Sequence, residues 1–320
     1  MKFTEEKLRL FAAPLSATED QKCQKAIIMV CDALRPLGFT DDNKSISKML
    51  NETFAYMIEM RNSAAGRRIK IFIQGSYAND TCVRMESDVD IAVIQEDVFR
   101  TEYRPGITES RYGFTTIQKT EISFKDEVQL ALMAKFGEDV KRGDKSIKIH
   151  GNTYRKDTDA VPCQRLRDYR NDYNYDKSNY IGGIVIYPDS GGMIVNYPEQ
   201  HIENGYRKDV NTKRSYKRMV RIIKKMRHLM EDAGYSSAKK ISSFGLESLV
   251  WNVGDNILTE IPTVLWYTFY KVVQSLKANF IYYNDYREAN GIKPLFPDEN
   301  TKTAYQQFIK DLSIFYEYET

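Results

Sequence analysis

Two kinds of hydrophobic spacing divide the first half of the chain. Behind a capping box at residues 16–19, apolar residues recur at helical intervals as far as Pro36, and similar spacing predicts helices over 44–61 and 123–136. Short runs of β-forming residues predict strands at residues 69–73, 88–94, 146–150, 158–163, 180–187 and 193–197. Between residues 95 and 120 the pattern weakens, and we expect a long loop or lid there.

After about residue 205 the strand patterns end and helical patterns replace them. Helical spacing covers residues 212–233, 243–257, 261–277 and 301–316. The fold class expected from this order is α+β. A catalytic lobe with a mixed sheet and leading N-terminal helices covers residues 1–205, and a helical lobe covers residues 206–320.

Composition narrows the class of protein. Hydrophobic residues make up 42% of the 320 residues and charged residues 28%, which is typical of globular proteins rather than disordered or membrane proteins. The four cysteines and three histidines are scattered, so we expect neither a zinc site nor a disulfide framework, and a cytoplasmic location. The net charge of +3 is too small to require a nucleic-acid partner, but it suits a small anionic substrate.

A glycine–serine turn followed by two spaced carboxylates is the most specific chemical signal. Gly75 lets the backbone approach a phosphate, and Ser76 adds a hydroxyl donor. One strand residue separates Asp88 from Asp90, so both side chains point to the same face of the strand, where they can bind Mg²⁺. An isolated Asp-x-Asp is often only a solvated pair. The strand, the turn, the short gap and the carboxylates together resemble the nucleotidyltransferase fold shared with DNA polymerase β.

A two-metal phosphoryl-transfer site needs a third carboxylate near the attacking hydroxyl. Asp157 and Asp159 both precede an apolar strand and can face the same side. We prefer Asp159, because it lies directly against the apolar residues that would anchor it. Asp157 is interpreted as a turn residue.

The first helix predicted for the second lobe carries a basic face. Lys217, Arg221, Lys224 and His228 fall on one side of it, and a solvated basic face explains most such residues. Lys224 is the exception, because its stem can pack between apolar neighbours while its ammonium reaches a phosphate. Ser243 begins the next helix, where its hydroxyl can bind a phosphate or simply cap the helix.

These motifs resemble the cGAS/DncV-like nucleotidyltransferases (CD-NTases) of bacterial anti-phage CBASS signalling, which make cyclic di- and trinucleotides. The likeness runs from about residue 69 to 253 and is greatest to the subgroup often called clade E. Its pieces are Gln-Gly-Ser-Tyr-Ala-Asn-Asp-Thr at 74–81, Ser-Asp-Val-Asp at 87–90, Asp-Ala-Val-Pro-Cys at 159–163, Val-Asn-Tyr-Pro-Glu-Gln-His at 195–201, Glu-Asn-Gly at 203–205, Tyr-Lys-Arg-Met-Val-Arg-Ile-Ile-Lys-Lys at 216–225 and Ser-Phe-Gly-Leu-Glu-Ser-Leu-Val at 243–250.

The resemblance implies a set of catalytic and metal-binding residues. Asp88, Asp90 and Asp159 would bind two Mg²⁺ ions, for which Mn²⁺ can substitute, and the likeness favours Asp159 over Asp157. The active site would lie in a cleft between the two lobes.

The resemblance also implies how the nucleotides bind. Ser76, Lys224 and Ser243 would hold the donor triphosphate. The asparagine that matches Asn196 lies in the base pocket of this subgroup and favours uracil, whose O4 and N3–H an amide can pair with. Without the family, Asn196 would be interpreted as a turn residue at the end of a hairpin.

The implied function is synthesis of a cyclic dinucleotide second messenger from NTPs, with release of pyrophosphate. UTP is the expected substrate, joined to ATP or to a second UTP, and a downstream effector would respond to the product. We expect a monomer that forms no stable complex with nucleic acid and does not associate with a membrane. One alternative is a template-independent transferase acting on RNA or protein. Another is an inactive nucleotide sensor or RNA-binding module.

Overall fold

The computed structural model describes residues 2–42, 44–83, 88–115 and 122–318, and its contacts divide the chain into two compact units. The sheet unit comprises residues 17–75 and 88–199, and the helical unit comprises residues 1–16, 76–87 and 200–320. Ser87 and residues 116–120 of the expected loop lie outside the described residues.

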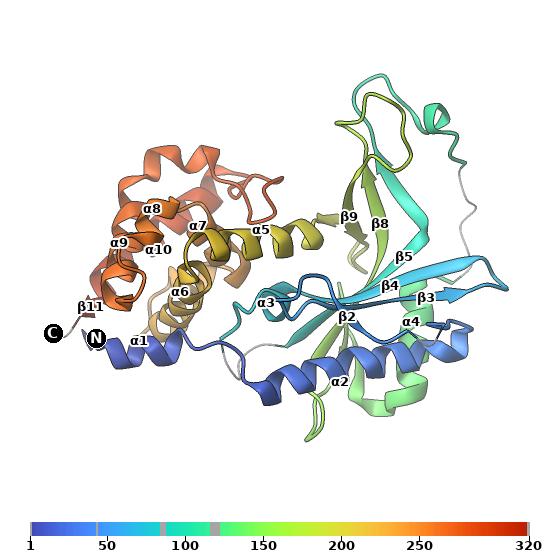
Figure 1. Ribbon diagram of the computed structural model, residues 1–320, viewed down its shortest axis with the longest axis horizontal. Helices are drawn as coiled ribbons and strands as arrows, with labels where there is room; N and C mark the ends of the chain where they lie inside the picture. The colour runs from blue at the N-terminus through green and yellow to red at the C-terminus, as the bar shows by residue number, and fades with distance from the viewer. Residues whose placement is uncertain (1, 43, 84–87, 116–121, 319–320) are drawn as a thin grey trace. The chain divides into compact units, whose positions relative to one another are not determined.

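A mixed sheet forms the sheet unit, with nine strands among the described residues in the order β10-β9-β8-β5-β4-β3-β2 and with the β6–β7 hairpin joined to β8 (Figure 1). Among the described strands of this sheet, only β5 and β8 run parallel, and the other neighbours are antiparallel. The strands are β2 (Ser47–Lys48), β3 (Tyr56–Asn62), β4 (Arg67–Gln74), β5 (Val89–Glu102), β6 (Val140–Arg142), β7 (Ile147–Ile149), β8 (Thr158–Asp168), β9 (Ile181–Ile186) and β10 (Ile194–Asn196).

Two helices cover one face of this sheet, α2 (Ala17–Leu34) and α4 (Phe124–Phe136) (Figure 1). A capping box between Ser123 and Asp126 begins α4. The Tyr56 hydroxyl on β3 donates to Asp20 of α2 at 3.1 Å, which identifies the covered side of that strand. On the opposite side of the sheet, Phe72, Ala92 and Ile94 are fully buried as well.

The predicted helix over residues 44–61 is wrong, because this segment forms β2 and β3. Burial alternates along β3, where Ile58 and Met60 are buried and Glu59 and Arg61 are exposed. That alternation has the period of a strand, and pairing with β4 fixes it. The strand predicted at 88–94 is also longer than expected, because β5 continues through the first part of the expected loop.

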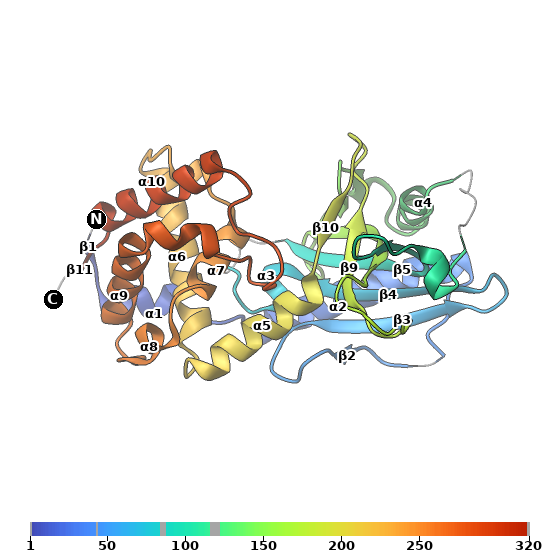
Figure 2. The ribbon, with the colours of Figure 1, turned by 90° about the horizontal axis from the view of Figure 1, so that it is seen from above.

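The helical unit is built around α6 (Ser215–Asp232), which packs against α1, α7, α9 and α10 (Figure 2). Its α-helices are α1 (Glu5–Phe11), α5 (Pro198–Asn211, from residue 200), α7 (Ser243–Trp251), α8 (Asp255–Thr259), α9 (Leu265–Ala278) and α10 (Glu299–Phe315), with α3 (Gly75–Ala78) starting at the unit boundary. Short 3₁₀ helices in the chain are η1 (Arg35–Leu37), η2 (Glu109–Tyr112), η3 (Gly137–Asp139), η4 (Ala238–Lys240) and η5 (Phe280–Asp285).

Residues 1–16 belong to the helical unit, whereas the sequence pattern predicts them in the first lobe. The reason is a parallel pairing of β1 (Lys2–Phe3) with β11 (Glu317–Tyr318). Phe3 is fully buried and stacks on Tyr316, with ring centroids 5.6 Å apart. Among the described residues, no helix combines the length and apolar character that a bilayer-spanning segment needs.

Candidate active site

Four residues form one row across neighbouring strands of the sheet unit. Gln74 on β4 pairs with Asp90 on β5, Asp90 pairs with Asp159 on β8, and Asp159 pairs with Lys148 on β7. Directly paired residues point to the same face of a sheet, so these side chains share a face. By strand alternation this is the face opposite the one that Tyr56 and α2 occupy.

Asp88 lies next to this row, one residue before β5 begins. Its carboxylate accepts a hydrogen bond from the Lys148 ammonium at 2.9 Å. The two side chains are 38% and 37% exposed, so solvent reaches the pair. The structure thus brings together the three predicted carboxylates and adds a lysine that sequence patterns did not single out.

The preference for Asp159 over Asp157 agrees with their contacts. Asp157 accepts a hydrogen bond from the Gly151 backbone at 2.8 Å, so its carboxylate closes the loop before β8, as expected of a turn residue. Asp159 stands opposite Asp90 and accepts a hydrogen bond from the Ser146 hydroxyl.

Gly75 is required by the geometry around Asp90. Its φ of +70° lies in the left-handed region, and a Cβ added there would lie 2.6 Å from Asp90 Oδ2. The sequence motif suggested a glycine that lets a phosphate approach. The structure gives this residue a second task, which is to leave room for the Asp90 carboxylate.

The electrostatics of this face suit a divalent cation. Burial, followed by the charges of Asp159 and Asp88, raises the pKa of Asp90 to about 7. Burial and the charge of Asp88 also raise the pKa of Asp159, which Lys148 opposes. Carboxylates that repel one another favour a bound Mg²⁺, whose oxygen ligands they supply. As the side chains stand, no three His, Cys, Asp or Glu residues among those described form a preassembled metal site, and Asp88 turns to Lys148 instead.

The predicted phosphate ligand Lys224 lies in a buried polar cluster of the helical unit. Its ammonium donates to the Thr81 carbonyl at 3.0 Å, to the Thr81 hydroxyl at 3.3 Å and to Glu247 at 2.8 Å. Glu247 also contacts His201 Nε2 at 2.8 Å. Burial opposes ionisation of Glu247, but Lys224 and then His201 hold its pKa well below the usual range.

These contacts differ from the expectation that the Lys224 ammonium is free to reach a phosphate. An ammonium has three N–H donors, and Lys224 uses them on Thr81 and Glu247. The interpretation of the basic face as solvated is wrong for Lys217 and Arg221, which are both 5% exposed.

The two predicted phosphate-binding serines are half-buried. Ser76 is the second residue of α3, and Ser243 is the first residue of α7. Ser242, rather than Ser243, caps α7, because its hydroxyl accepts a hydrogen bond from Gly245 N at 3.0 Å. The hydroxyl of Ser243 is therefore not used as the helix cap.

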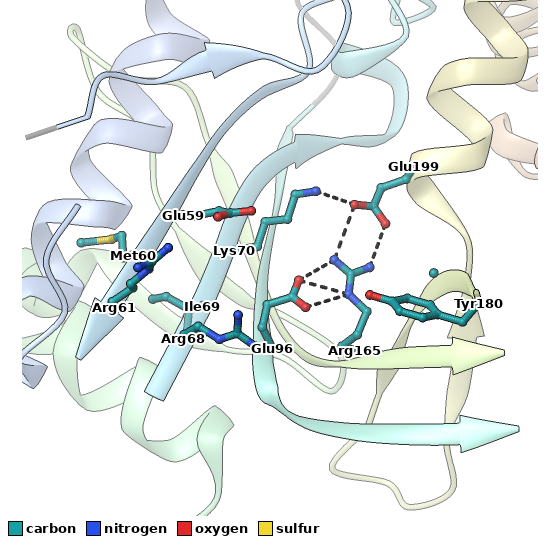
Figure 3. A pocket seen from close by; sticks show the side chains of 11 residues that line it. Glu59, Met60, Arg61, Arg68, Ile69, Lys70, Glu96, Arg165, Tyr180 and Glu199 are labelled. Carbon is teal, nitrogen blue, oxygen red and sulfur yellow. Dashed lines mark hydrogen bonds and ion pairs between the residues drawn. The ribbon is translucent and has the colours of Figure 1, made fainter. Parts of the chain in front are cut away.

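Asn196 ends β10 at the edge of the sheet, where it pairs with Ile184 on β9. Three residues later, Glu199 binds Lys70 at 2.5 Å and the Arg165 guanidinium at 2.7 Å. The buried Arg165 also binds Glu96, and Figure 3 shows its guanidinium between the two glutamates. This network fixes the start of α5, and with it the segment that carries Asn196.

A cavity of about 250 Å³ opens beside this network (Figure 3). Its wall is predominantly polar and includes Lys70, Glu96, Arg165, Tyr180 and Glu199. In β4 and β8, Lys70 and Arg165 share the strand parity of Gln74 and Asp159, so the cavity lies on the face that carries the carboxylates.

Sequence patterns missed Lys148, Thr81, His201 and Glu247. Thr81, His201 and Glu247 lie within the motifs quoted above, close to residues whose chemical role is more obvious. Lys148 has no local signal, because its contact with Asp88 spans 60 residues and depends on strand register.

Comparison with known proteins decides the family. The chain is 44% identical to the cyclic GMP-AMP synthase CdnE03 of Staphylococcus schleiferi, over 99% of this chain and 98% of that protein. The chain belongs to the cGAS/DncV-like nucleotidyltransferase family. The model of this family's C-terminal helical domain matches residues 203–317, within the helical unit of this nucleotidyltransferase.

Two further relatives support the same family and fold. This nucleotidyltransferase is 35% identical to the cyclic dipyrimidine nucleotide synthase CdnE of Cecembia lonarensis, over 91% of this chain and 87% of that one. Its fold matches Rhodothermus marinus CdnE, a c-UMP-AMP synthase solved with Apcpp and Upnpp. That match has a TM-score of 0.74 and 26% identity, and covers 97% of this chain and 96% of the other. The predicted α+β class and the predicted family are confirmed, and the chain is an enzyme of the CdnE type.

Proposed function

We propose that this enzyme joins two NTPs into a cyclic dinucleotide, with the metal-dependent chemistry at Asp88, Asp90 and Asp159. The observation that carries the proposal is the register of Asp90 and Asp159 on one face of the sheet, next to a glycine that leaves room for Asp90. The product would serve as a second messenger in anti-phage defence, as expected of this family, and act on a separate effector.

The reaction consists of two successive nucleotidyl transfers. In each, a ribose hydroxyl attacks an α-phosphorus, a P–O bond forms, and the bond to the leaving pyrophosphate breaks. Asp159 orients the hydroxyl and takes its proton toward solvent, while Asp90 and Asp88 hold the cation. Bound Mg²⁺ supplies charge neutralisation at the phosphates and lowers the pKa of the attacking hydroxyl. After the first transfer the linear intermediate turns over, and the second transfer closes the ring.

The triphosphate contacts are assigned to the hydroxyls of Ser76 and Ser243. The position of the Ser243 hydroxyl, which does not cap α7 but stands at its N-terminus, supports this, because such a position favours anions. The pair of Lys224 with Glu247 gives this lysine a second role, which is to hold α6 and α7 together. A direct phosphate contact by Lys224 would require it to give up one of its present partners.

The choice of base is assigned to Asn196. Its amide can donate to a keto oxygen and accept from the neighbouring imino N–H. Uracil presents this pair as O4 and N3–H, and guanine presents the same pair as O6 and N1–H. The family motif favours UTP, whereas the Staphylococcus schleiferi relative is named for GMP and AMP. We therefore propose that Asn196 reads one keto–imino base, from UTP or GTP, and that ATP is the partner nucleotide.

Incubation with each pair of NTPs, Mg²⁺ and phosphatase, followed by mass spectrometry, tests this proposal. A phosphatase-resistant cyclic dinucleotide that contains adenine and either uracil or guanine is expected. Label on a polymer would instead support a transferase that uses an RNA or protein acceptor, and no product at all would support a sensor. The relatives named above are all cyclic nucleotide synthases, which argues against both alternatives.

A further inference from the structure

Lys148 places a positive charge directly beside the carboxylates of the candidate metal site. Its ammonium lies 2.9 Å from Asp88 Oδ2, and its backbone pairs with Asp159. The lysine therefore reaches across the row from the strand next to Asp159 to the residue before β5. The ammonium therefore contacts a carboxylate oxygen of Asp88 that a metal ion would bind.

The backbone that carries Lys148 is firmly held. In the turn of the β6–β7 hairpin, the carbonyls of Gly143 and Asp144 accept hydrogen bonds from the buried Lys125 of α4, at 2.9 and 2.7 Å. The Arg142 guanidinium at the end of β6 binds both carboxylate oxygens of Asp189 at 2.7 and 2.8 Å. The hairpin is thus fastened at two points.

The side chain of Lys148 is free to move by comparison. It is 37% exposed, and its ammonium stands on a flexible four-carbon stem. A lysine with a fixed backbone and a solvated head can change partners without moving the strand. These are the properties needed for a counter-ion that gives way to another cation.

We propose that Lys148 is a resident counter-ion of the metal site, which holds Asp88 in the metal-free enzyme and leaves it when a divalent cation binds. The inference rests on the proposed function, since it takes Asp88 as a metal ligand. The step is an exchange of ionic partners: the ion pair of Asp88 and Lys148 opens, Asp88 binds the metal, and the ammonium turns to solvent. No covalent bond and no proton changes place.

The exchange affects how metal and nucleotide bind to the enzyme. The divalent ion gains the carboxylates that hold it but must displace one ammonium, so metal alone binds more weakly than it would without Lys148. A triphosphate that arrives with the metal offers the released ammonium a new anionic partner. Metal and nucleotide are therefore expected to bind cooperatively, and Lys148 is the residue that couples them.

Three variants test the proposal. Lys148→Met keeps the length of the stem and removes the charge, and Lys148→Arg keeps the charge. Lys141→Met is the matched control, because Lys141 pairs with Lys148 on β6, is exposed, and forms no ion pair among the described residues. Mn²⁺ is the probe, and free Mn²⁺ is measured by electron paramagnetic resonance, with and without a non-hydrolysable NTP analogue.

We expect Lys148→Met to bind Mn²⁺ on the order of tenfold more tightly than wild type when no nucleotide is present. Lys148→Arg and Lys141→Met should stay near wild type. The analogue should tighten Mn²⁺ binding more in wild type than in Lys148→Met. A Lys148→Met protein that is folded by circular dichroism but binds Mn²⁺ equally or more weakly would overturn the proposal.

A second measurement covers a variant that unfolds during the titration. The melting temperature is followed as Mn²⁺ is added. The increase in melting temperature should be larger for Lys148→Met than for wild type. An equal or smaller gain would overturn the proposal. Because no turnover is involved, these results are separate from the product assay. Absence of any cyclic product would refute the proposed function, while tighter Mn²⁺ binding by Lys148→Met would still support the exchange.

Discussion

Two lysine–carboxylate pairs of almost equal length differ completely in their surroundings. Lys224 and Glu247 in the helical unit are 2.8 Å apart, with side chains 3% and 2% exposed. Lys148 and Asp88 in the sheet unit are 2.9 Å apart, with side chains 37% and 38% exposed. Distance therefore says little about the task of an ion pair. Burial makes the first pair a fixed part of the fold, and exposure leaves the second open to exchange.

The largest effect is expected from Asp90, which belongs to neither pair and has no basic partner among the described residues. Asp90→Asn should reduce cyclic product by on the order of a thousandfold, since it removes a charge that the reaction needs. Its melting temperature without metal should not fall, because repulsion from Asp159 and Asp88 is relieved. Product is measured by mass spectrometry, with Asp157→Asn as the control. Activity within tenfold of wild type would refute the metal assignment.

The buried pair should dominate stability. Lys224→Met deprives the buried Glu247 of its ammonium partner and leaves only the contact with His201, so the free energy of unfolding should fall by about 3–5 kcal/mol in urea denaturation. Glu247→Leu in the same chain should restore part of the loss. A Lys224→Met protein that keeps its stability but shows a raised KM for NTPs would favour the direct phosphate contact instead.

The buried pair should also make the protein sensitive to acid. The folded-state pKa of Glu247 lies below its ordinary value of 4.5, so its stabilising effect is present above about pH 4.5 and is lost as pH falls. The stability difference between wild type and Glu247→Gln should then shrink by up to about 1.4 kcal/mol per pH unit. Urea denaturation between pH 6 and pH 3 measures it. Parallel curves over this range would contradict the assignment.

The exposed pair should matter least to folding. Lys148→Met should change the free energy of unfolding of the metal-free enzyme by about 1 kcal/mol or less, as is usual for solvent-exposed ion pairs. The same denaturation series measures this value next to Lys224→Met. A loss of similar size in both variants would remove the distinction between the two pairs.

Much of the sheet unit could be predicted because its signals are local. β4 is a run of β-formers before a glycine, and the serine before α4 caps it together with Asp126. The helix prediction for residues 44–61 failed because the apolar residues of this segment satisfy helical spacing as well as strand alternation. Only the hydrogen-bonding partner, β4, selects the strand. α5 was missed because few apolar residues mark it, although Pro198 stands at its first position.

The site could be predicted where residue type and spacing carry the chemistry. The carboxylates of Asp88, Asp90 and Asp159 follow from two short motifs and a strand. The partners of Lys224 and Asp88 could not be found this way. Each contact joins segments that are distant in sequence, and each depends on the register of strands or on the packing of helices. The sequence identifies the charged residue, but only the fold determines which side chain neutralises its charge.

The pairing of β1 with β11 also bears on how the chain is made. The aromatic residues that bury Phe3, Phe315 and Tyr316, are translated about 310 residues after it. Most of the sheet unit can assemble during that interval, since residues 17–75 and 88–199 are complete first. Nascent chains would thus carry formed carboxylate strands without a finished helical unit.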